Sequence, residues 1–124
     1  MWTILVVDDS RLIRGIVVAA LQRLALTVRE AANGAEALTM CAESVVDVVL
    51  LDHEMPGEYG LAVCSALKRT TPALPVVLMS GHGREVLCEA IGSPPDFFLH
   101  KPFTLDELEQ VVWAAMGNGG RTHP

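Results

Sequence analysis

Four apolar segments of the chain each end at one or two polar residues that could do chemistry together. These ends carry Asp8 and Asp9, Asp52, Ser80, and Lys101. Three carboxylates held close together repel one another and raise one another's pKa, and a divalent cation removes that cost. Oxygen ligands in a small site favour Mg²⁺ or Mn²⁺, and a site with few protein ligands suits Mg²⁺ with bound waters. The pattern therefore predicts a magnesium site.

The same residues could form a pocket for a phosphoryl group. A cation, a lysine and a hydroxyl that converge on a carboxylate stabilise the charge of phosphoryl transfer. Asp52 is then the candidate nucleophile, and its acyl phosphate would be neutralised by Mg²⁺ and Lys101 and hydrogen-bonded by Ser80. An aspartate at a strand end is more often a helix cap than a ligand. The prediction therefore depends on the coincidence of four strand ends.

The elements that must position these residues alternate between strand-like and helix-like segments. Continuous apolar runs such as Ile4–Val7 are typical of parallel strands buried on both faces. Predicted strands cover residues 4–7, 27–31, 46–51, 75–79 and 97–99. Predicted helices cover residues 11–24, the segment from the Asn33 cap to about 42, residues 61–69, residues 84–91, and the segment from the Thr104 cap to 117. This alternation predicts an α/β fold with one doubly wound, five-stranded parallel sheet flanked by five helices. Ligands bind at the carboxyl edge of such a sheet.

Helical periodicity also predicts which side chains are buried. In the first helix the expected buried positions are Ile13, Ile16, Val17, Ala20 and Leu24, and Val18 is expected to face outward. In the last helix they are Leu105, Leu108, Val112 and Ala115. Trp113 lies away from that stripe, so we expect it to be exposed and to contribute to a contact surface.

Length and composition limit the class of protein. A chain of 124 residues with 51% hydrophobic and 19% charged residues is globular and forms one domain. We assign the domain to residues 1–117 and a flexible tail or the start of a linker to residues 118–124. The formal net charge of −6 and the aromatic content of 5% argue against direct binding of nucleic acid.

Apolar runs such as Ile16–Leu21 are too short for a membrane span, and the N-terminus does not resemble a signal peptide. Cys41, Cys64 and Cys88 lie among apolar residues without metal-ligand spacing, as expected for reduced thiols in a cytoplasmic protein. The four histidines are His53, His82, His100 and His123. A metal or phosphohistidine site among them is one alternative, but we expect them in exposed loops, where they tune local charge.

The combined motifs resemble the receiver domain of two-component response regulators over residues 3 to about 116. The matching segments are Ile4–Ser10, Leu50–Gly57 with Gly60 after it, Met79–Gly81, and Phe98–Phe103. The resemblance implies a flavodoxin-like strand order of 2-1-3-4-5. It also implies that Asp52 is the phosphoacceptor, that Asp8 and Asp9 hold Mg²⁺ together with Asp52, and that Glu54 gives a backbone carbonyl to the metal.

The resemblance assigns the remaining site residues as well. Ser80 matches the hydroxyl that turns toward the phosphoryl group, the backbone of Gly81 contacts that group, and Lys101 pairs with it. Phe98 matches the switch aromatic, although it has no hydroxyl and can only pack. The peptide bond before Pro102 is expected to be cis. In the family, the variable residue at the position of Glu54 can reach over the site and affect the lifetime of the phosphoryl group.

The leading hypothesis is a signalling switch that takes a phosphoryl group from the phosphohistidine of a sensor histidine kinase or phosphotransfer protein. The last-helix surface then changes and controls an unknown downstream protein or effector domain. A homodimer formed through the last two helices is a further alternative. Such a protein is no enzyme beyond its own phosphotransfer and dephosphorylation. The alternatives are an unphosphorylated pseudo-receiver and a small-molecule phosphohydrolase, although the Asp8-Asp9 pair lacks the Asp-x-Asp spacing typical of the latter.

Overall fold

The computed structural model describes residues 2–83 and 94–118 of the chain. Along the sequence the elements are β1 (Thr3–Val7), α1 (Arg11–Gln22), β2 (Thr27–Ala31), α2 (Gly34–Glu43), β3 (Val48–Asp52), β4 (Glu54–Met55), β5 (Glu58–Tyr59), α3 (Gly60–Thr70), β6 (Val76–Ser80), β7 (Phe97–His100) and α5 (Leu105–Asn118). The helix expected at residues 84–91 lies outside the described residues.

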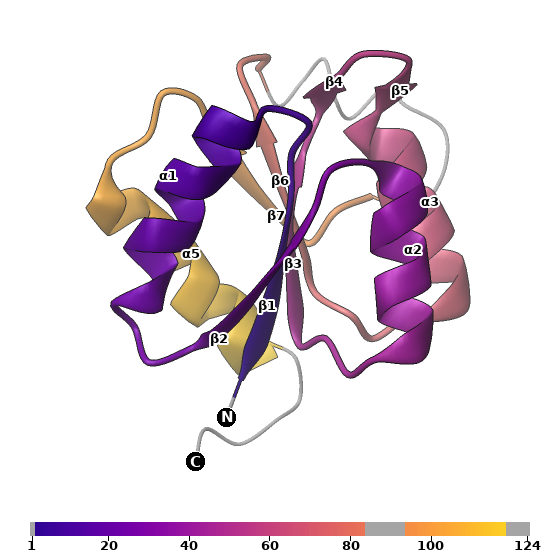
Figure 1. The fold of residues 1–124 in the computed structure, drawn as a ribbon, viewed down its shortest axis with the longest axis horizontal. Helices are drawn as coiled ribbons and strands as arrows, with labels where there is room; N and C mark the ends of the chain where they lie inside the picture. Colours follow the sequence, from indigo (N-terminus) through magenta and orange to yellow (C-terminus); the bar gives the residue numbers. More distant parts are fainter. Residues whose placement is uncertain (1, 84–93, 119–124) are drawn as a thin grey trace.

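The main sheet has five strands in the order β2-β1-β3-β6-β7, and every neighbouring pair is parallel. Strand by strand this is the predicted order 2-1-3-4-5. Helices α1 and α5 cover one face of the sheet, and α2 and α3 cover the other (Figure 1). The predicted doubly wound α/β fold is therefore confirmed, and the carboxyl ends of the strands meet at one edge of the sheet.

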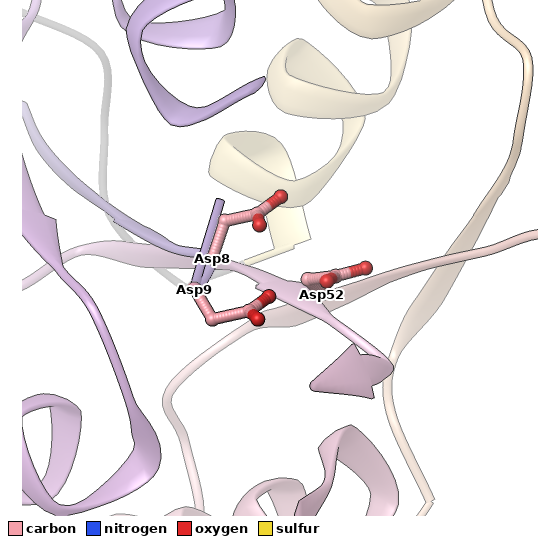
Figure 2. A group of neighbouring side chains, drawn as sticks. All are labelled: Asp8, Asp9 and Asp52. Carbon is pink, nitrogen blue, oxygen red and sulfur yellow. The ribbon is translucent and has the colours of Figure 1, made fainter. Parts of the chain in front are cut away.

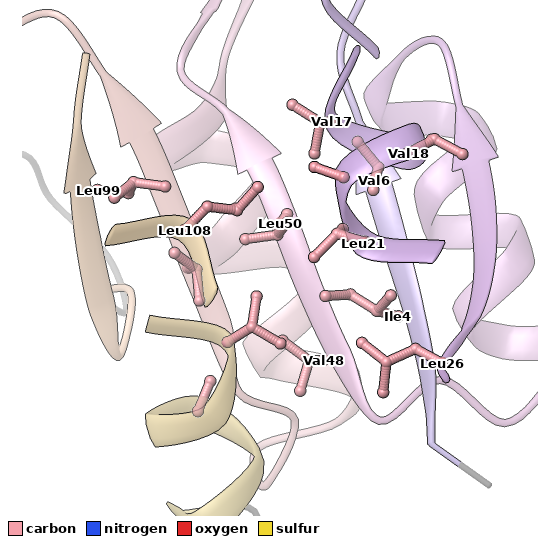
Figure 3. Close-up of a cluster of buried hydrophobic side chains, with 14 of the residues drawn as sticks. Ile4, Val6, Val17, Val18, Leu21, Leu26, Val48, Leu50, Leu99 and Leu108 are labelled. Atoms are coloured by element: carbon pink, nitrogen blue, oxygen red, sulfur yellow. The ribbon is translucent and has the colours of Figure 1, made fainter. Parts of the chain in front are cut away.

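Successive residues of the central strands enter two separate hydrophobic cores. In β3, Val48 and Leu50 belong to the core under α1 and α5, whereas Val49 and Leu51 belong to the core under α2 and α3. The same alternation holds in β1 and β6. Figure 3 shows the first core, in which Leu108 of α5 lies over the sheet. Burial on both faces explains why these strands read as unbroken apolar runs.

Side chains at the helix starts confirm two of the predicted caps. The Asn33 side chain accepts a hydrogen bond from the Glu36 N–H at 2.9 Å, and Glu36 accepts one from the Ala32 N–H at 2.8 Å. At the start of α5 the Thr104 hydroxyl accepts from the Glu107 N–H at 3.1 Å, and Glu107 accepts from the N–H of Thr104 itself at 2.9 Å. Both capping boxes satisfy backbone donors that have no partner inside the helix.

The predicted buried face of α1 was right at Val17 and Ala20, which are 3% and 8% exposed, but wrong at other positions. Ile13 and Ile16 are 41% and 56% exposed, whereas Val18 is only 9% exposed and packs in the core. Apolar residues occur on more than one side of this helix, so periodicity alone did not identify the side that faces the sheet. In α5 the expectation failed only at Leu105, which is 47% exposed in the first turn, while Trp113 is 40% exposed as predicted.

Some element boundaries differ from the prediction. The third strand begins at Val48 because Asp47 instead binds the start of β1: its carboxylate accepts from the Thr3 N–H at 2.7 Å. Helix α1 ends at Gln22, and Ala25 beyond it has a φ of 56°. The short antiparallel hairpin of β4 and β5 was not predicted. Within residues 2–83 and 94–118, no helix has the length and apolar character that a membrane span requires.

Candidate functional site

The carboxyl ends of β1 and β3 bring three aspartates together. These strands pair in register from Ile4 with Val48 to Val7 with Leu51, so Asp8 and Asp52 follow at neighbouring positions. Carboxylate oxygens of Asp8, Asp9 and Asp52 all lie within 4.8 Å of one another. The three side chains extend in the same direction in Figure 2. This is the acidic cluster that the sequence predicts at the strand ends.

Asp8 is the most confined of the three carboxylates. It is 2% exposed, and its Oδ1 atom accepts a hydrogen bond from the Ser10 N–H at 2.9 Å. Its buried Oδ2 atom has no hydrogen-bond partner among the described residues. Burial raises the pKa of Asp8, and the charges of Asp52 and Asp9 raise it further against the opposing effect of the Ser10 N–H. An oxygen in this state is a ready ligand for a cation.

Lys101 approaches the cluster from the end of β7. Its ammonium group donates a hydrogen bond to Oδ1 of Asp52, which is 3% exposed. Burial raises the pKa of Asp52, while the hydrogen bond and charge of Lys101 act in the opposite direction. The Lys101 backbone N–H donates to the carbonyl of Ser80 at 2.8 Å, which fixes the lysine beside the end of β6. The peptide bond between Lys101 and Pro102 is cis, as expected.

Glu54 extends its side chain across the site, although that side chain stays 36% exposed. Its Oε2 atom accepts a hydrogen bond from the Ser80 hydroxyl at 2.8 Å, and its Oε1 atom accepts one from the Gly81 N–H at 3.0 Å. Oε1 also lies 3.8 Å from Nζ of Lys101. Partial burial acts to raise the pKa of Glu54, but the Gly81 and Ser80 hydrogen bonds and the lysine outweigh it and lower the pKa. The sequence predicted the reach of Glu54 but not these partners.

Two glycines after Asp52 are required for different reasons, one for its backbone conformation and one for close packing. Gly57 has a φ of 82°, which the turn between β4 and β5 requires. A Cβ atom on Gly60 would lie 2.6 Å from the Asp52 carbonyl oxygen and 2.7 Å from Cα of His53. Only glycine lets the start of α3 pack this closely against the end of β3, so Gly60 helps to fix the backbone of Asp52.

His53 departs from the prediction of exposed histidines. It is 8% exposed, and its ring lies 5.4 Å from that of Tyr59 and 6.2 Å from that of His82. Burial lowers its pKa. The unpredicted hairpin supplies Tyr59, which explains why the sequence did not reveal the burial. His82 and His100 are exposed as expected, and His123 lies outside the described residues.

Phe98 and the cysteines occupy less polar surroundings. Phe98 is half-buried and packs against the core under α2 and α3. Cys41 and Cys64 are in no disulfide bond, and burial raises the pKa of Cys64 to about 11. Cys88 lies outside the described residues. None of these side chains therefore joins the polar group at the strand ends in the part of the chain that the structure describes.

An acidic cluster, a lysine and a hydroxyl at the carboxyl edge of a doubly wound sheet define a class of α/β domain that accepts phosphoryl groups. Comparison with known proteins agrees: the family described as "Response regulator receiver domain" matches residues 4–113. The chain therefore belongs to the receiver domain family, the phosphoacceptor switches of two-component response regulators. The flavodoxin-like topology is the one found in its structural relatives.

Individual relatives show the extent of the similarity. The chain is 37% identical to the DNA-binding transcriptional regulator NtrC of Escherichia coli over 114 residues, which are 91% of this chain and 24% of that protein. It is 33% identical over 110 residues, or 89% of this chain, to the sensor kinase/phosphatase LuxN of Vibrio campbellii, of which they are 13%. The chain thus corresponds to a minor part of the length of these proteins.

Two solved structures match this chain over nearly their whole length. The receiver domain of NtrX from Brucella abortus has 36% identity and a TM-score of 0.84, with 92% of this chain and 98% of that chain covered. The response regulator TrrA from Thermotoga maritima, solved in complex with Mg²⁺ and BeF, has 31% identity and a TM-score of 0.84, with 93% and 99% covered.

Proposed function

We propose that Asp52 is the residue that accepts the phosphoryl group. One observation carries this proposal: Asp52 is the carboxylate common to the acidic cluster and to the ion pair with Lys101. A nucleophile for phosphoryl transfer needs positive charge close to the phosphoryl oxygens, and the pairing of these groups supplies it on one side. Asp8 and Asp9 lie on the other side, where a cation would balance their charge.

Magnesium fits the residues that are present. The cluster offers oxygen ligands alone, and the partnerless Oδ2 atom of Asp8 is a buried acceptor directed at no protein donor that the structure describes. We assign the metal to the carboxylates of Asp8, Asp9 and Asp52 and to the backbone carbonyl of Glu54. Bound there, Mg²⁺ would neutralise charge on the carboxylates and on the incoming phosphoryl oxygens. The relative TrrA was solved with Mg²⁺ and BeF.

The transfer itself requires one bond to form and one to break. An oxygen of Asp52 attacks the phosphorus of a phosphohistidine in line with the departing imidazole nitrogen, so that a P–O bond replaces the P–N bond. Lys101 then pairs with a phosphoryl oxygen, and the Ser80 hydroxyl and the Gly81 N–H donate hydrogen bonds to the others. Phe98 follows the movement of Ser80. The chemistry is limited to phosphorylation and dephosphorylation of the chain itself.

The surface of α1 supports docking of the phosphoryl donor. This helix begins at Arg11, directly after the acidic pair, and it exposes Leu12, Ile13 and Ile16. An apolar surface next to the acceptor suits a sensor histidine kinase or phosphotransfer protein, whose phosphohistidine must reach Asp52. We further propose that this exchange takes place in the cytoplasm.

The surface of α5 is the proposed output. Trp113 is exposed there, and α5 follows Lys101 closely in the chain, so a change at the lysine can reach the helix. A downstream protein, an effector domain or a second copy of the receiver would bind this surface. Direct binding of nucleic acid or membrane forms no part of the proposal.

Intact mass after treatment with acetyl phosphate and Mg²⁺ tests the acceptor assignment. We expect the gain of one phosphoryl group, which hydroxylamine removes and which is absent from the Asp52→Asn variant. A protein that gains no mass would instead be a pseudo-receiver. Repeated turnover of a generic phosphate ester would identify a small-molecule phosphohydrolase.

A further inference from the structure

Two hydrogen-bond donors and one cation surround the carboxylate of Glu54. They are the Ser80 hydroxyl at 2.8 Å, the Gly81 N–H at 3.0 Å and the Lys101 ammonium at 3.8 Å. The donors come from the ends of β6 and β7, whereas Glu54 belongs to β4, so only the tertiary fold brings them together. A hydroxyl, a backbone N–H and an ammonium around a pair of anionic oxygens form a small anion site.

This anion site coincides with the one that the proposed function gives to the phosphoryl group. The Ser80 hydroxyl and the Gly81 N–H each have one proton, so neither can hydrogen-bond the Glu54 carboxylate and a phosphoryl oxygen in the same geometry. We propose that the side chain of Glu54 occupies the phosphoryl site of the unphosphorylated protein, and that phosphorylation of Asp52 must displace it. The inference rests on the proposed function and adds a competing group within the chain.

The contact with Glu54 prevents the Ser80 hydroxyl from donating a hydrogen bond to a phosphoryl group. The hydroxyl donates its proton to Glu54 and accepts a hydrogen bond from the His82 N–H at 2.9 Å. Its donor capacity is therefore used, because a hydroxyl has only one proton. Ser80 can turn toward a phosphoryl group only after Glu54 releases it. Glu54 thus acts as a positioning residue that links occupancy of the anion site to the position of Ser80.

A purely structural role for Glu54 gives a different expectation. If its two hydrogen bonds only tied the hairpin to the end of β6, their loss would lower the free energy of unfolding without altering anion binding. If Glu54 competes for the site, its loss frees the Ser80 hydroxyl and the Gly81 N–H and removes a negative charge that repels the entering anion. Anion affinity therefore separates the two roles.

The experiment measures the binding of beryllofluoride, a mimic of the phosphoryl group, at saturating Mg²⁺. The variants are Glu54→Ala, which removes the carboxylate, and Glu54→Gln, which keeps the reach of the side chain without its charge. Glu43→Gln is the matched control, because it loses the same charge at the exposed end of α2. Affinity for Mg²⁺ alone is titrated separately for each protein, since loss of a nearby carboxylate also weakens cation binding.

We expect beryllofluoride to bind about tenfold more tightly to Glu54→Ala than to the wild-type protein, because it no longer displaces a charged hydrogen-bond acceptor. Glu54→Gln should lie between the two, and Glu43→Gln should match the wild-type protein. A second readout needs neither metal nor mimic: the amide ¹H–¹⁵N signal of Gly81 should shift in metal-free Glu54→Ala and stay in place in Glu43→Gln.

Unchanged or weaker beryllofluoride binding in both Glu54 variants would overturn the inference while leaving the acceptor assignment intact. A Gly81 signal that does not move in Glu54→Ala would also overturn it, because the contact would not exist in solution. A wild-type protein that takes up neither beryllofluoride nor a phosphoryl group would instead contradict the proposed function, and the inference with it.

Discussion

The two ends of the parallel sheet both carry aspartates, but the structure treats their carboxylates differently. At the amino end, Asp47 accepts a hydrogen bond from the Thr3 N–H at 2.7 Å. Asp96 accepts one from the Val76 N–H at 2.8 Å and forms an ion pair with Lys68. Each of these aspartates therefore stabilises the beginning of a strand through a backbone donor that would otherwise lack a partner.

At the carboxyl end the aspartates are crowded against one another, although Asp8 also accepts a hydrogen bond from the Ser10 N–H. Asp8 and Asp52 are both buried, and burial raises the pKa of each. Asp8 keeps a buried oxygen without a partner among the described residues. The difference indicates that a lone carboxylate paired with the N–H of a strand start is structural, whereas crowded carboxylates with a buried oxygen left without a protein donor indicate a site for a cation or a substrate.

Substitution of Asp52 should have the largest effect on phosphorylation, and it tests most directly whether the aspartates at the two ends of the sheet differ in function. Asp52→Asn should abolish phosphorylation by acetyl phosphate and Mg²⁺, because the amide is no nucleophile for phosphorus, and circular dichroism should show the fold unchanged. Asp96→Asn, which changes a carboxylate at the amino end, is the control and should gain one phosphoryl group like the wild-type protein. A mass gain in Asp52→Asn would contradict the acceptor assignment.

Removal of the carboxylate at the amino end should change stability and leave the chemistry in place. Asp47→Ala leaves the Thr3 N–H without its acceptor, which should lower the free energy of unfolding by about 1–3 kcal/mol. Urea denaturation with and without Mg²⁺ measures this loss, and Asp47→Asn, which keeps an acceptor oxygen, should lose less. Because Mg²⁺ also stabilises the wild-type protein, the loss is measured as the difference between the two proteins, and a difference that disappears in Mg²⁺ would show that the two ends are not separate.

Removal of Asp9, the exposed carboxylate of the acidic cluster, should raise the stability of the metal-free protein, whereas removal of Asp47 lowers stability. Asp9→Ala relieves repulsion among three neighbouring carboxylates, so the metal-free variant should melt up to about 3 °C higher than the wild-type protein. Mg²⁺ should then raise the melting temperature of the variant less than that of the wild-type protein. Thermal melts in chelator and in Mg²⁺ measure both effects; a lower melting temperature in chelator would argue against a shared cluster.

The smallest effect should appear in tryptophan fluorescence. Trp2 is buried at the amino end of the sheet, whereas Trp113 is exposed on α5, which follows Lys101 in the chain. Beryllofluoride with Mg²⁺ should therefore alter the emission of Trp113 more than that of Trp2. Measurements on Trp2→Phe and Trp113→Phe separate the two signals. If Trp113→Phe retains the full change, α5 is not the surface that responds.

The central strands and the residues at their carboxyl ends could be predicted from the sequence, because their hydrophobic pattern is compatible with only one kind of structure. Ile4–Val7 and Val48–Leu51 are apolar at every position, which suits a strand buried on both faces, and each run is followed or ended by its site aspartate. Strand order and the meeting of polar ends at one edge then follow from the topology of parallel sheets. The positions of Asp8, Asp52, Ser80 and Lys101 could therefore be inferred before the structure was known.

The remainder depended on contacts that no local pattern encodes. Helix α1 has apolar side chains on several sides, and only its packing against the sheet decides that Val18 is buried and Ile16 exposed. The burial of His53 depends on a hairpin that brings Tyr59 over it. The partners of Glu54 lie more than twenty residues away on another strand. These features belong to tertiary structure, where propensity and periodicity are weakest.

The alternation of the central strands between two cores has a consequence for how substitutions combine. Leu50 and Leu51 are bonded neighbours, yet their side chains pack on opposite sides of the sheet, in cores that share no helix among residues 2–83 and 94–118. Free-energy changes add when the substituted side chains have no common partners and fail to add when they pack together. Truncations at Leu50 and Leu51 should therefore be close to additive, whereas those at Leu50 and Leu108, distant in sequence but in one core, should interact. In this domain, energetic coupling follows the face of the sheet on which a side chain packs more closely than distance along the chain.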